Sequence, residues 1–319
     1  MSMVWMFPGQ GAQSARMGLR FMERAAFAKV IAQCETASGR PVADLVQACA
    51  EGDLMRTDRA QLAIFAMSMG ILACLQEADR APDLIAGHSL GHFSALVAAG
   101  VLSLDDAIVL VDARGRYMRH GGQRRAGGMA VVQGLPGSDV TMVLSHTKLM
   151  VWPANLNLDD QTVVSGSTTD LPAAREAILA AGGRWVPLNV SGAFHSPLLQ
   201  PEADAFASHI ADVALSDPRV PVISNASGSL LLDATSIRAD LMGHMTGQVR
   251  WTAVMDRIAS TAPKTLIEVG PAKVLTGLML RHAPQLRPLS TGLPRLLDRA
   301  VAAISAHGNL FSDLQDAAA

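Results

Sequence analysis

The segment LIAGHSLGHFSALVAAG, residues 84–100, decides the fold of this chain. Its first three residues are apolar and predict a buried strand, and the run of small residues at 93–100 predicts a helix. Between them, GHSLG at 87–91 matches the Gly-x-Ser-x-Gly pattern, in which two glycines permit a tight strand-to-helix turn that holds the serine hydroxyl outward. We therefore predict an α/β fold with Ser89 as a nucleophile. An ordinary structural turn is the alternative, because glycine and serine are common residues.

Composition excludes several classes of function. The 319 residues are half hydrophobic and carry a formal net charge of −2, with scattered basic residues, so nucleic acid is not an expected partner. The three cysteines lie far apart, which predicts neither a disulfide framework nor a zinc site and fits a cytoplasmic protein. The apolar N-terminus lacks the basic region of a signal peptide. The apolar stretches at 62–75 and 84–102 are assigned to the core, so no membrane association is expected.

Segment order predicts two subdomains. Strands and helices alternate through residues 1–124, and a glycine-rich stretch at 120–128 indicates a linker. Residues 125–194 then have the order β-α-β-β-α-β, which is ferredoxin-like. The longer alternation resumes over 195–319. We expect a large α/β subdomain, residues 1–124 and 195–319, with a small ferredoxin-like subdomain, residues 125–194, inserted into it.

A serine nucleophile needs a base, and the chain has nine histidines. His195 is the best candidate because its loop, GAFHSP at 192–197, lies where the chain returns to the large subdomain. His92, three residues after Ser89, is expected to border the pocket, whereas His88 is assigned to packing because neighbouring residues in a strand point to opposite faces. The other histidines are assigned to loops and helix surfaces: His120, His146, His209, His244, His282 and His307.

Six motifs then occur in the order found in malonyl-CoA:acyl carrier protein transacylases and polyketide synthase acyltransferase domains, which the chain resembles over residues 3–282. They are FPGQGAQ (7–13), GHSLG (87–91), RG (114–115), GAFHS (192–196), VRW (249–251) and EVGP (268–271). The resemblance implies an α/β-hydrolase-like large subdomain with the ferredoxin-like insertion. It also implies ping-pong transfer of a malonyl group from malonyl-CoA, a CoA thioester, to the phosphopantetheine thiol of an acyl carrier protein. No metal and no tightly bound cofactor are expected.

The resemblance assigns catalytic roles residue by residue. Ser89 is the nucleophile, and His195 is the general base that takes its proton during attack on the thioester. The backbone N–H groups of Gln10 and Leu90 form the oxyanion hole. The second nitrogen of His195 is held by a backbone carbonyl, expected at Arg250.

Substrate selection is assigned to a second group of residues. Arg114 is expected to bind the free carboxylate of a malonyl unit through two parallel hydrogen bonds, which a lysine cannot reproduce. Phe194 resembles the residue of malonyl-selective members and leaves no room for an α-methyl group. His92, Asn155 and Asn225 occupy positions that resemble pocket positions.

Several alternatives stay open at this point. An acyl-thioester hydrolase and a malonyl transferase subunit of malonate decarboxylase would use the same serine and histidine, and a catalytically silent scaffold would use neither. Arg119, Arg124 and Arg125 are candidates for docking an acidic carrier protein, and a solvated linker is the preferred alternative for this segment.

Overall fold

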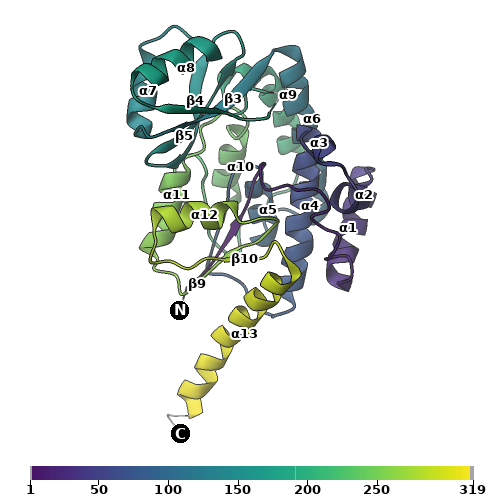
Figure 1. Cartoon of the computed structure of the whole chain (residues 1–319). Helices are drawn as coiled ribbons and strands as arrows, with labels where there is room; N and C mark the ends of the chain where they lie inside the picture. Colours follow the sequence, from purple (N-terminus) through teal and green to yellow (C-terminus); the bar gives the residue numbers. More distant parts are fainter. Residues whose placement is uncertain (1, 191, 317–319) are drawn as a thin grey trace.

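The computed structural model describes residues 2–190 and 192–316, with side chains as far as Ala306. It contains two sheets, and the larger one forms the centre of the molecule (Figure 1). Neighbouring strands of this sheet are parallel except for the last pair, β7 and β8. The strand order is β10 (Leu289–Ser290), β9 (Thr265–Glu268), β1 (Met3–Phe7), β2 (Leu84–Gly87), β7 (Val222–Ile223) and β8 (Leu230–Leu231).

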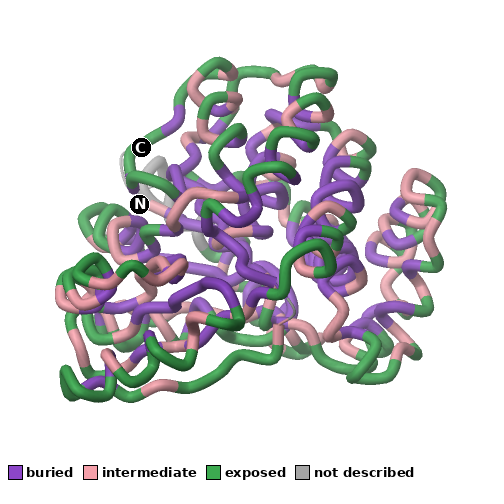
Figure 2. The backbone as a smooth tube through the Cα atoms, turned by 90° about the horizontal axis from the view of Figure 1, so that it is seen from above, coloured by how far each residue is buried: buried purple, intermediate pink, exposed green. Residues whose placement is uncertain are grey.

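The large sheet is buried on both faces, as expected for parallel strands. Alternate residues of β1 belong to different cores: Trp5 packs toward α1, α4 and α6, whereas Val4 and Met6 pack toward α11 and α12. Figure 2 shows the buried residues concentrated in the middle of the molecule. The helices are α1 (Ala25–Ser38), α2 (Val42–Gln47), α3 (Glu51–Leu54), α4 (Thr57–Gln76), α5 (Gly91–Ala98), α6 (Leu104–Arg124), α9 (Gln200–Asp212), α10 (Ala234–Met242), α11 (Trp251–Ser260), α12 (Val274–His282) and α13 (Pro294–Asp316).

Helix α4 is long and apolar enough to cross a membrane by length and composition alone. In the structure, 89% of its most apolar window is buried inside the protein, and it packs between α1 and α6. It is therefore a core helix, as the sequence predicted for this stretch.

The carboxyl ends of the parallel strands lie at one edge of the large sheet. Phe7 at the end of β1 pairs with Gly87 at the end of β2, and His88 N–H donates to the Phe7 carbonyl at 2.9 Å. The loops that follow β1, β2 and β7 therefore converge, and they carry Gln10, Ser89 and Asn225. In open α/β sheets this edge is where ligands bind.

The second sheet confirms the predicted ferredoxin-like order. It comprises β3 (Gly127–Gln133), α7 (Gly137–Ser145), β4 (Val151–Leu158), β5 (Gln161–Ser167), α8 (Leu171–Ala180) and β6 (Arg184–Pro187). The strands are antiparallel in the order β4-β5-β3-β6, and α7 and α8 cover one face through a small apolar core. The boundaries of the small subdomain at residues 125 and 194 stay a prediction.

The linker predicted at residues 120–128 is wrong. Helix α6 is capped at its start by Ser103, whose hydroxyl accepts a hydrogen bond from the Asp106 N–H, and it continues to Arg124. Its glycine at 121 allows close packing rather than flexibility, because a Cβ atom there would lie 2.3 Å from a methyl carbon of Leu199. Strand β3 then starts at Gly127, where a Cβ atom would lie 2.7 Å from the backbone nitrogen of Ala193.

Candidate active site

The GHSLG turn has the geometry of a nucleophile elbow. Ser89 adopts a left-handed backbone conformation with φ of 47°, which is strained for a residue with a side chain. Both glycines are required by close contacts: a Cβ atom on Gly87 would lie 2.1 Å from the Gly91 carbonyl oxygen, and one on Gly91 would lie 2.1 Å from the Phe7 carbonyl oxygen. The sequence therefore forces β2 to turn sharply into α5 with the Ser89 hydroxyl outward.

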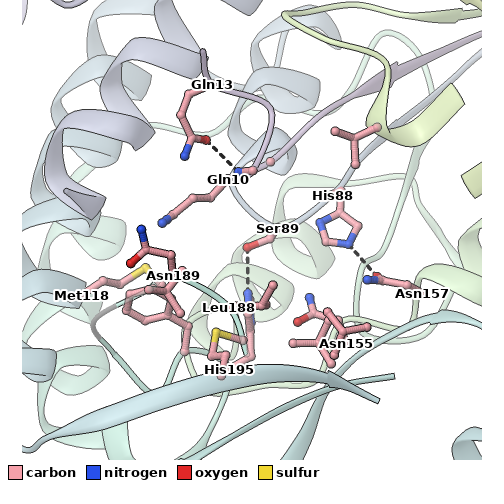
Figure 3. Close-up of a pocket in the computed structure, with 18 of the residues that line it drawn as sticks. Gln10, Gln13, His88, Ser89, Met118, Asn155, Asn157, Leu188, Asn189 and His195 are labelled. Carbon is pink, nitrogen blue, oxygen red and sulfur yellow. Dashed lines mark hydrogen bonds between the residues drawn. The ribbon is translucent and has the colours of Figure 1, made fainter. Parts of the chain in front are cut away.

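Ser89 and His195 lie together, as the sequence predicted. Ser89 Oγ is 2.7 Å from His195 Nε2 (Figure 3). His195 Nδ1 lies 3.0 Å from the Gly247 carbonyl oxygen. Because a carbonyl only accepts, Nδ1 carries the ring proton and Nε2 is free to accept the proton of Ser89. Burial, together with the positive charge of Arg114, lowers the pKa of His195 to about 3. The imidazole is therefore neutral near pH 7, the state that a general base needs.

The prediction that the Arg250 carbonyl orients His195 is wrong. The chain pairs with strand β4 just before α11, where Val249 N–H donates to the Ala154 carbonyl at 2.8 Å. The Arg250 carbonyl then accepts the first-turn hydrogen bond of α11 from Val254 at 3.2 Å. The carbonyl that meets the imidazole is that of Gly247, three residues earlier.

Arg114 is a buried cation beside the nucleophile. The residue is 1% exposed, its Nη1 donates to Gln61 Oε1 at 2.7 Å, and its Nη2 donates to Ser89 Oγ at 3.2 Å. Within the described part of the chain it has no carboxylate within ion-pair distance, and its Nε has no hydrogen-bond partner. Burial lowers its pKa to about 9, so the group is still charged near pH 7. A buried charge without a partner is costly, and a bound anion would relieve that cost.

A pocket of about 360 Å³ opens over Ser89, between the two sheets. Gln10, Asn155 and Phe194 line it, as the sequence predicted, and Figure 3 shows Gln10 and Asn155 on opposite sides of Ser89. Gly192 leaves the space that the Phe194 ring occupies, because a Cβ atom there would lie 2.4 Å from the ring. The face of the small sheet opposite α7 and α8 contributes apolar walls. Polar groups near the reacting serine and apolar walls elsewhere suit a small acyl group on a long thioester arm.

Two backbone N–H groups, those of Gln10 and Leu90, belong to the converging loops that follow β1 and β2. Gln10 follows the sharp turn after β1, and Leu90 immediately precedes α5, whose N-terminus carries partial positive charge. Among the described residues, neither N–H group has a hydrogen-bond acceptor. Both are therefore available for an oxyanion, and their assignment to the oxyanion hole stays a prediction.

The expectation that His92 and Asn225 contact the substrate is wrong. Both are buried, with exposed fractions of 0% and 3%, and neither lines the pocket. The helical turn after Ser89 directs His92 inward beneath the elbow instead of toward the cleft. Asn225 Oδ1 accepts a hydrogen bond from the Ser89 N–H at 3.0 Å, so its side chain stabilises the backbone of the elbow and does not face the substrate pocket.

Sequence reasoning also missed His244 and Gln61. His244 was assigned to a loop or surface, yet it is buried, with its ring centroid 6.2 Å from that of His195. Gln61 is a buried polar residue on α4 that holds Arg114. A polar residue inside the apolar run of α4 was the available signal for Gln61, whereas nothing in the local sequence marked His244.

The arginines proposed to dock a partner have different surroundings. Arg124 forms an ion pair with the buried carboxylate of Glu202, with Nε and Oε1 2.8 Å apart, so this one-to-one pair carries no net charge. Arg119 and Arg56 share a single carboxylate, that of Asp58, at 3.4 and 3.1 Å, so the two arginines together keep a net positive charge, and their side chains are each 38% exposed. Each directly follows a methionine that lines the pocket, Met118 or Met55. Arg56 and Arg119, called the basic rim below, therefore adjoin residues that line the pocket.

Comparison with known proteins gives one consistent result. Residues 4–289 match the family described as the acyl transferase domain. The chain is 32% identical over 303 residues to the malonyl CoA-acyl carrier protein transacylase of Bacillus subtilis, covering 93% of this chain and 96% of the relative. It is 34% identical over 306 residues to the transacylase of the same name from Salmonella typhimurium, covering 93% and 98%.

Solved structures agree with the sequence relatives. The malonyl CoA-acyl carrier protein transacylase of Coxiella burnetii superposes with a TM-score of 0.91 at 30% identity, covering 96% of this chain and 98% of that one. A complex of a type II polyketide synthase acyl carrier protein with its malonyl-transacylase superposes with a TM-score of 0.90 at 32% identity, covering 95% and 100%. The two-sheet architecture is therefore the family's architecture.

Proposed function

This chain belongs to the acyl transferase family of malonyl-CoA:acyl carrier protein transacylases, and we propose that Ser89, His195 and Arg114 carry out its reaction. The reaction moves a malonyl group from CoA to an acyl carrier protein. The observation that carries the residue assignment is the position of Arg114. A buried guanidinium that meets no carboxylate among the described residues donates a hydrogen bond to the nucleophile itself, which suits an acyl group with a free carboxylate at its far end.

The first half-reaction is acylation of Ser89. Ser89 Oγ attacks the thioester carbonyl while His195 Nε2 takes the hydroxyl proton, and the N–H groups of Gln10 and Leu90 bind the developing oxyanion. The C–S bond then breaks, and the imidazolium returns its proton to the sulfur of CoA. The Gly247 carbonyl keeps the proton on Nδ1 throughout and stabilises the imidazolium.

The second half-reaction transfers the malonyl group to the carrier protein. The phosphopantetheine thiol enters the same pocket, gives its proton to His195 and attacks the carbonyl of the Ser89 ester. The ester C–O bond then breaks, and the imidazolium returns the proton to Ser89 Oγ. No metal or redox step is needed for this exchange of a thioester for an ester and back. The three free cysteines support the cytoplasmic location expected from the sequence.

The basic rim is where we place the acyl carrier protein. Arg56 and Arg119 stand beside pocket-lining residues, so a partner docked there would direct its phosphopantetheine arm toward Ser89. Arg56→Gln and Arg119→Gln together are expected to raise the apparent KM for the carrier protein about three- to tenfold and to leave acylation by malonyl-CoA unchanged. Arg175→Gln on α8, an exposed arginine that forms an ion pair with Glu176, is the matched control. An unchanged KM for the carrier protein would remove the rim from the proposal.

The residue assignment is tested by mass spectrometry. Incubation with malonyl-CoA should add one malonyl group to the peptide that contains Ser89, and the Ser89→Ala variant should gain none. Addition of the holo carrier protein should move that group to the carrier protein thiol. Free malonate produced at the same rate with and without the carrier protein would indicate a hydrolase, and an acyl group on another residue would refute the assignment of Ser89.

A further inference from the structure

A polar chain lies beneath the nucleophile elbow and does not line the pocket: Asn225 after β7 and His92 on α5 are buried, and the side chain of Asp240 on α10 is 7% exposed. We propose that these three residues are positioning residues, which hold the strained backbone of Ser89 so that its hydroxyl stays in line with His195. The inference rests on the proposed function, because Ser89 is the nucleophile in both. None of the three residues would contact the substrate.

Asn225 closes the elbow from below. Its Oδ1 accepts a hydrogen bond from the Ser89 N–H at 3.0 Å, and its Nδ2 donates to the Gly87 carbonyl at 2.7 Å. One side chain therefore bridges both ends of the turn in which Ser89 holds a φ of 47°. The Asn225 carbonyl also accepts from the Arg250 N–H at 2.8 Å, which ties the elbow to the segment that holds His195. A strained conformation persists only where its surroundings fix it, and Asn225 supplies that fixation.

The hydrogen bonds of Asn225 determine which ring nitrogen of His92 accepts a hydrogen bond. A backbone N–H can only donate and a backbone carbonyl can only accept, so the orientation of the Asn225 amide is fixed. The atom 3.0 Å from His92 Nδ1 is therefore the donor Nδ2. His92 Nδ1 must accept this hydrogen bond, and the ring proton must lie on Nε2.

Asp240 keeps the ring proton on that side. Its Oδ2 lies 3.3 Å from His92 Nε2, at ion-pair distance but without hydrogen-bond alignment, and its Oδ1 accepts from the Ser224 hydroxyl. Burial would raise the pKa of Asp240, but His92 and Ser224 together lower it below its usual range, so the carboxyl group is ionised. A carboxylate at Nε2 stabilises the tautomer that Asn225 requires. The other tautomer would direct an N–H group at the Asn225 amide and displace it from Ser89.

Ring packing prevents His92 from turning. Its ring stacks on that of His244, with centroids 5.5 Å apart and planes at 21°. The His244 ring in turn meets the His195 ring edge-on at 6.2 Å. The positioning chain is thus packed against the general base as well as bonded to the nucleophile.

The test separates hydrogen bonding from packing. The His92→Leu/Asp240→Leu variant removes the acceptor for Asn225 without leaving a buried carboxylate unpaired, whereas His92→Asn/Asp240→Leu places Oδ1 where Nδ1 was and retains an acceptor. For the leucine pair, we expect kcat for acylation by malonyl-CoA to fall about 10- to 100-fold with KM within about twofold. For the asparagine pair, we expect kcat within about threefold of the wild-type value. An unchanged kcat in the leucine pair, or an equal loss in both pairs, would overturn the inference.

Two further measurements keep the test decisive. If the leucine pair does not fold, Asp240→Leu alone leaves His92 in place and is expected to lower kcat about tenfold, and a wild-type rate overturns the role of Asp240. Asp256→Leu breaks a comparable contact to His282, 2.9 Å long and on the surface, and should leave kcat unchanged.

Sulfonylation of Ser89 by phenylmethanesulfonyl fluoride separates this inference from the proposed function, because the reagent has no carboxylate for Arg114. Its rate should fall in parallel with kcat in the leucine pair and recover in the asparagine pair. A wild-type protein that reacts with the fluoride but not with malonyl-CoA refutes the proposed substrate. The sulfonylation rates of the variants then decide the positioning chain by themselves.

Discussion

Replacing Arg114 by leucine should remove the preference of the site for malonyl-CoA over acetyl-CoA. In the structure Arg114 is 1% exposed, and its guanidinium donates to the Ser89 hydroxyl. Since no carboxylate of the described residues forms an ion pair with it, a bound malonyl carboxylate would be its anionic partner. Removing one member of such a buried pair costs about 3–5 kcal/mol. At 1.36 kcal/mol per factor of ten, kcat/KM for malonyl-CoA should fall about 150- to 5,000-fold. Acetyl-CoA has no carboxylate, so its kcat/KM should change by less than about threefold.

The assay measures acyl-enzyme formation with both thioesters on the same enzyme preparation. Arg116→Leu is the matched control, since Arg116 lies two residues further along α6 with a side chain that is 61% exposed and should leave the ratio of the two values unchanged. Arg114→Lys keeps the charge but loses the planar fork, and should fall between wild type and leucine. Equal losses for malonyl-CoA and acetyl-CoA in Arg114→Leu would show that Arg114 supports Ser89 or the fold, and would refute carboxylate recognition.

Three further outcomes follow from the geometry. Because the pKa of His195 is lowered to about 3, its basic form persists as pH falls, so kcat/KM should stay flat between about pH 5.5 and 8, and a drop centred near pH 6.5 would contradict this. Gly91→Ala places a methyl group 2.1 Å from the Phe7 carbonyl oxygen and should lower the free energy of unfolding by about 3 kcal/mol in urea titrations, whereas Gly52→Ala, with open space around it, should not. Asp58→Ala leaves three arginines facing one another, which are partly solvent-screened, and should lower the free energy of unfolding by about 1–2 kcal/mol, a loss that added salt reduces.

The sequence predicted those parts of the molecule that depend on local spacing. The elbow was predictable because its five residues form one local motif, in which the close contact of Gly87 is with Gly91, and the ferredoxin-like order because each of its segments has its own periodicity. The carbonyl that holds His195 was not, because its identity depends on the pairing of Val249 with strand β4, about a hundred residues away. A pattern of apolar residues indicates that a segment is buried but not which loop it meets.

The surroundings of His244 and His92 were not predictable either, because they depend on which distant segments come together. His244 follows α10 in a stretch without a recognisable motif, and only the convergence of α5, α10 and the loop at residue 195 places it between two other imidazoles. His92 has a clear position in the sequence, three residues after Ser89, yet the direction of its side chain depends on how α5 sits on the sheet.

The reacting groups and part of the pocket wall lie on different parts of the fold, which affects how this enzyme can change over evolutionary time. No atom assigned to bond making or proton transfer lies on a strand of the antiparallel sheet, whereas strands β3, β4 and β5 of that sheet line the pocket through Met129, Val131, Asn155 and Val163. Substitutions at these pocket-lining positions would alter which acyl groups fit, and the reacting groups would stay unchanged. A lineage can thus acquire a new building block without reinventing its chemistry.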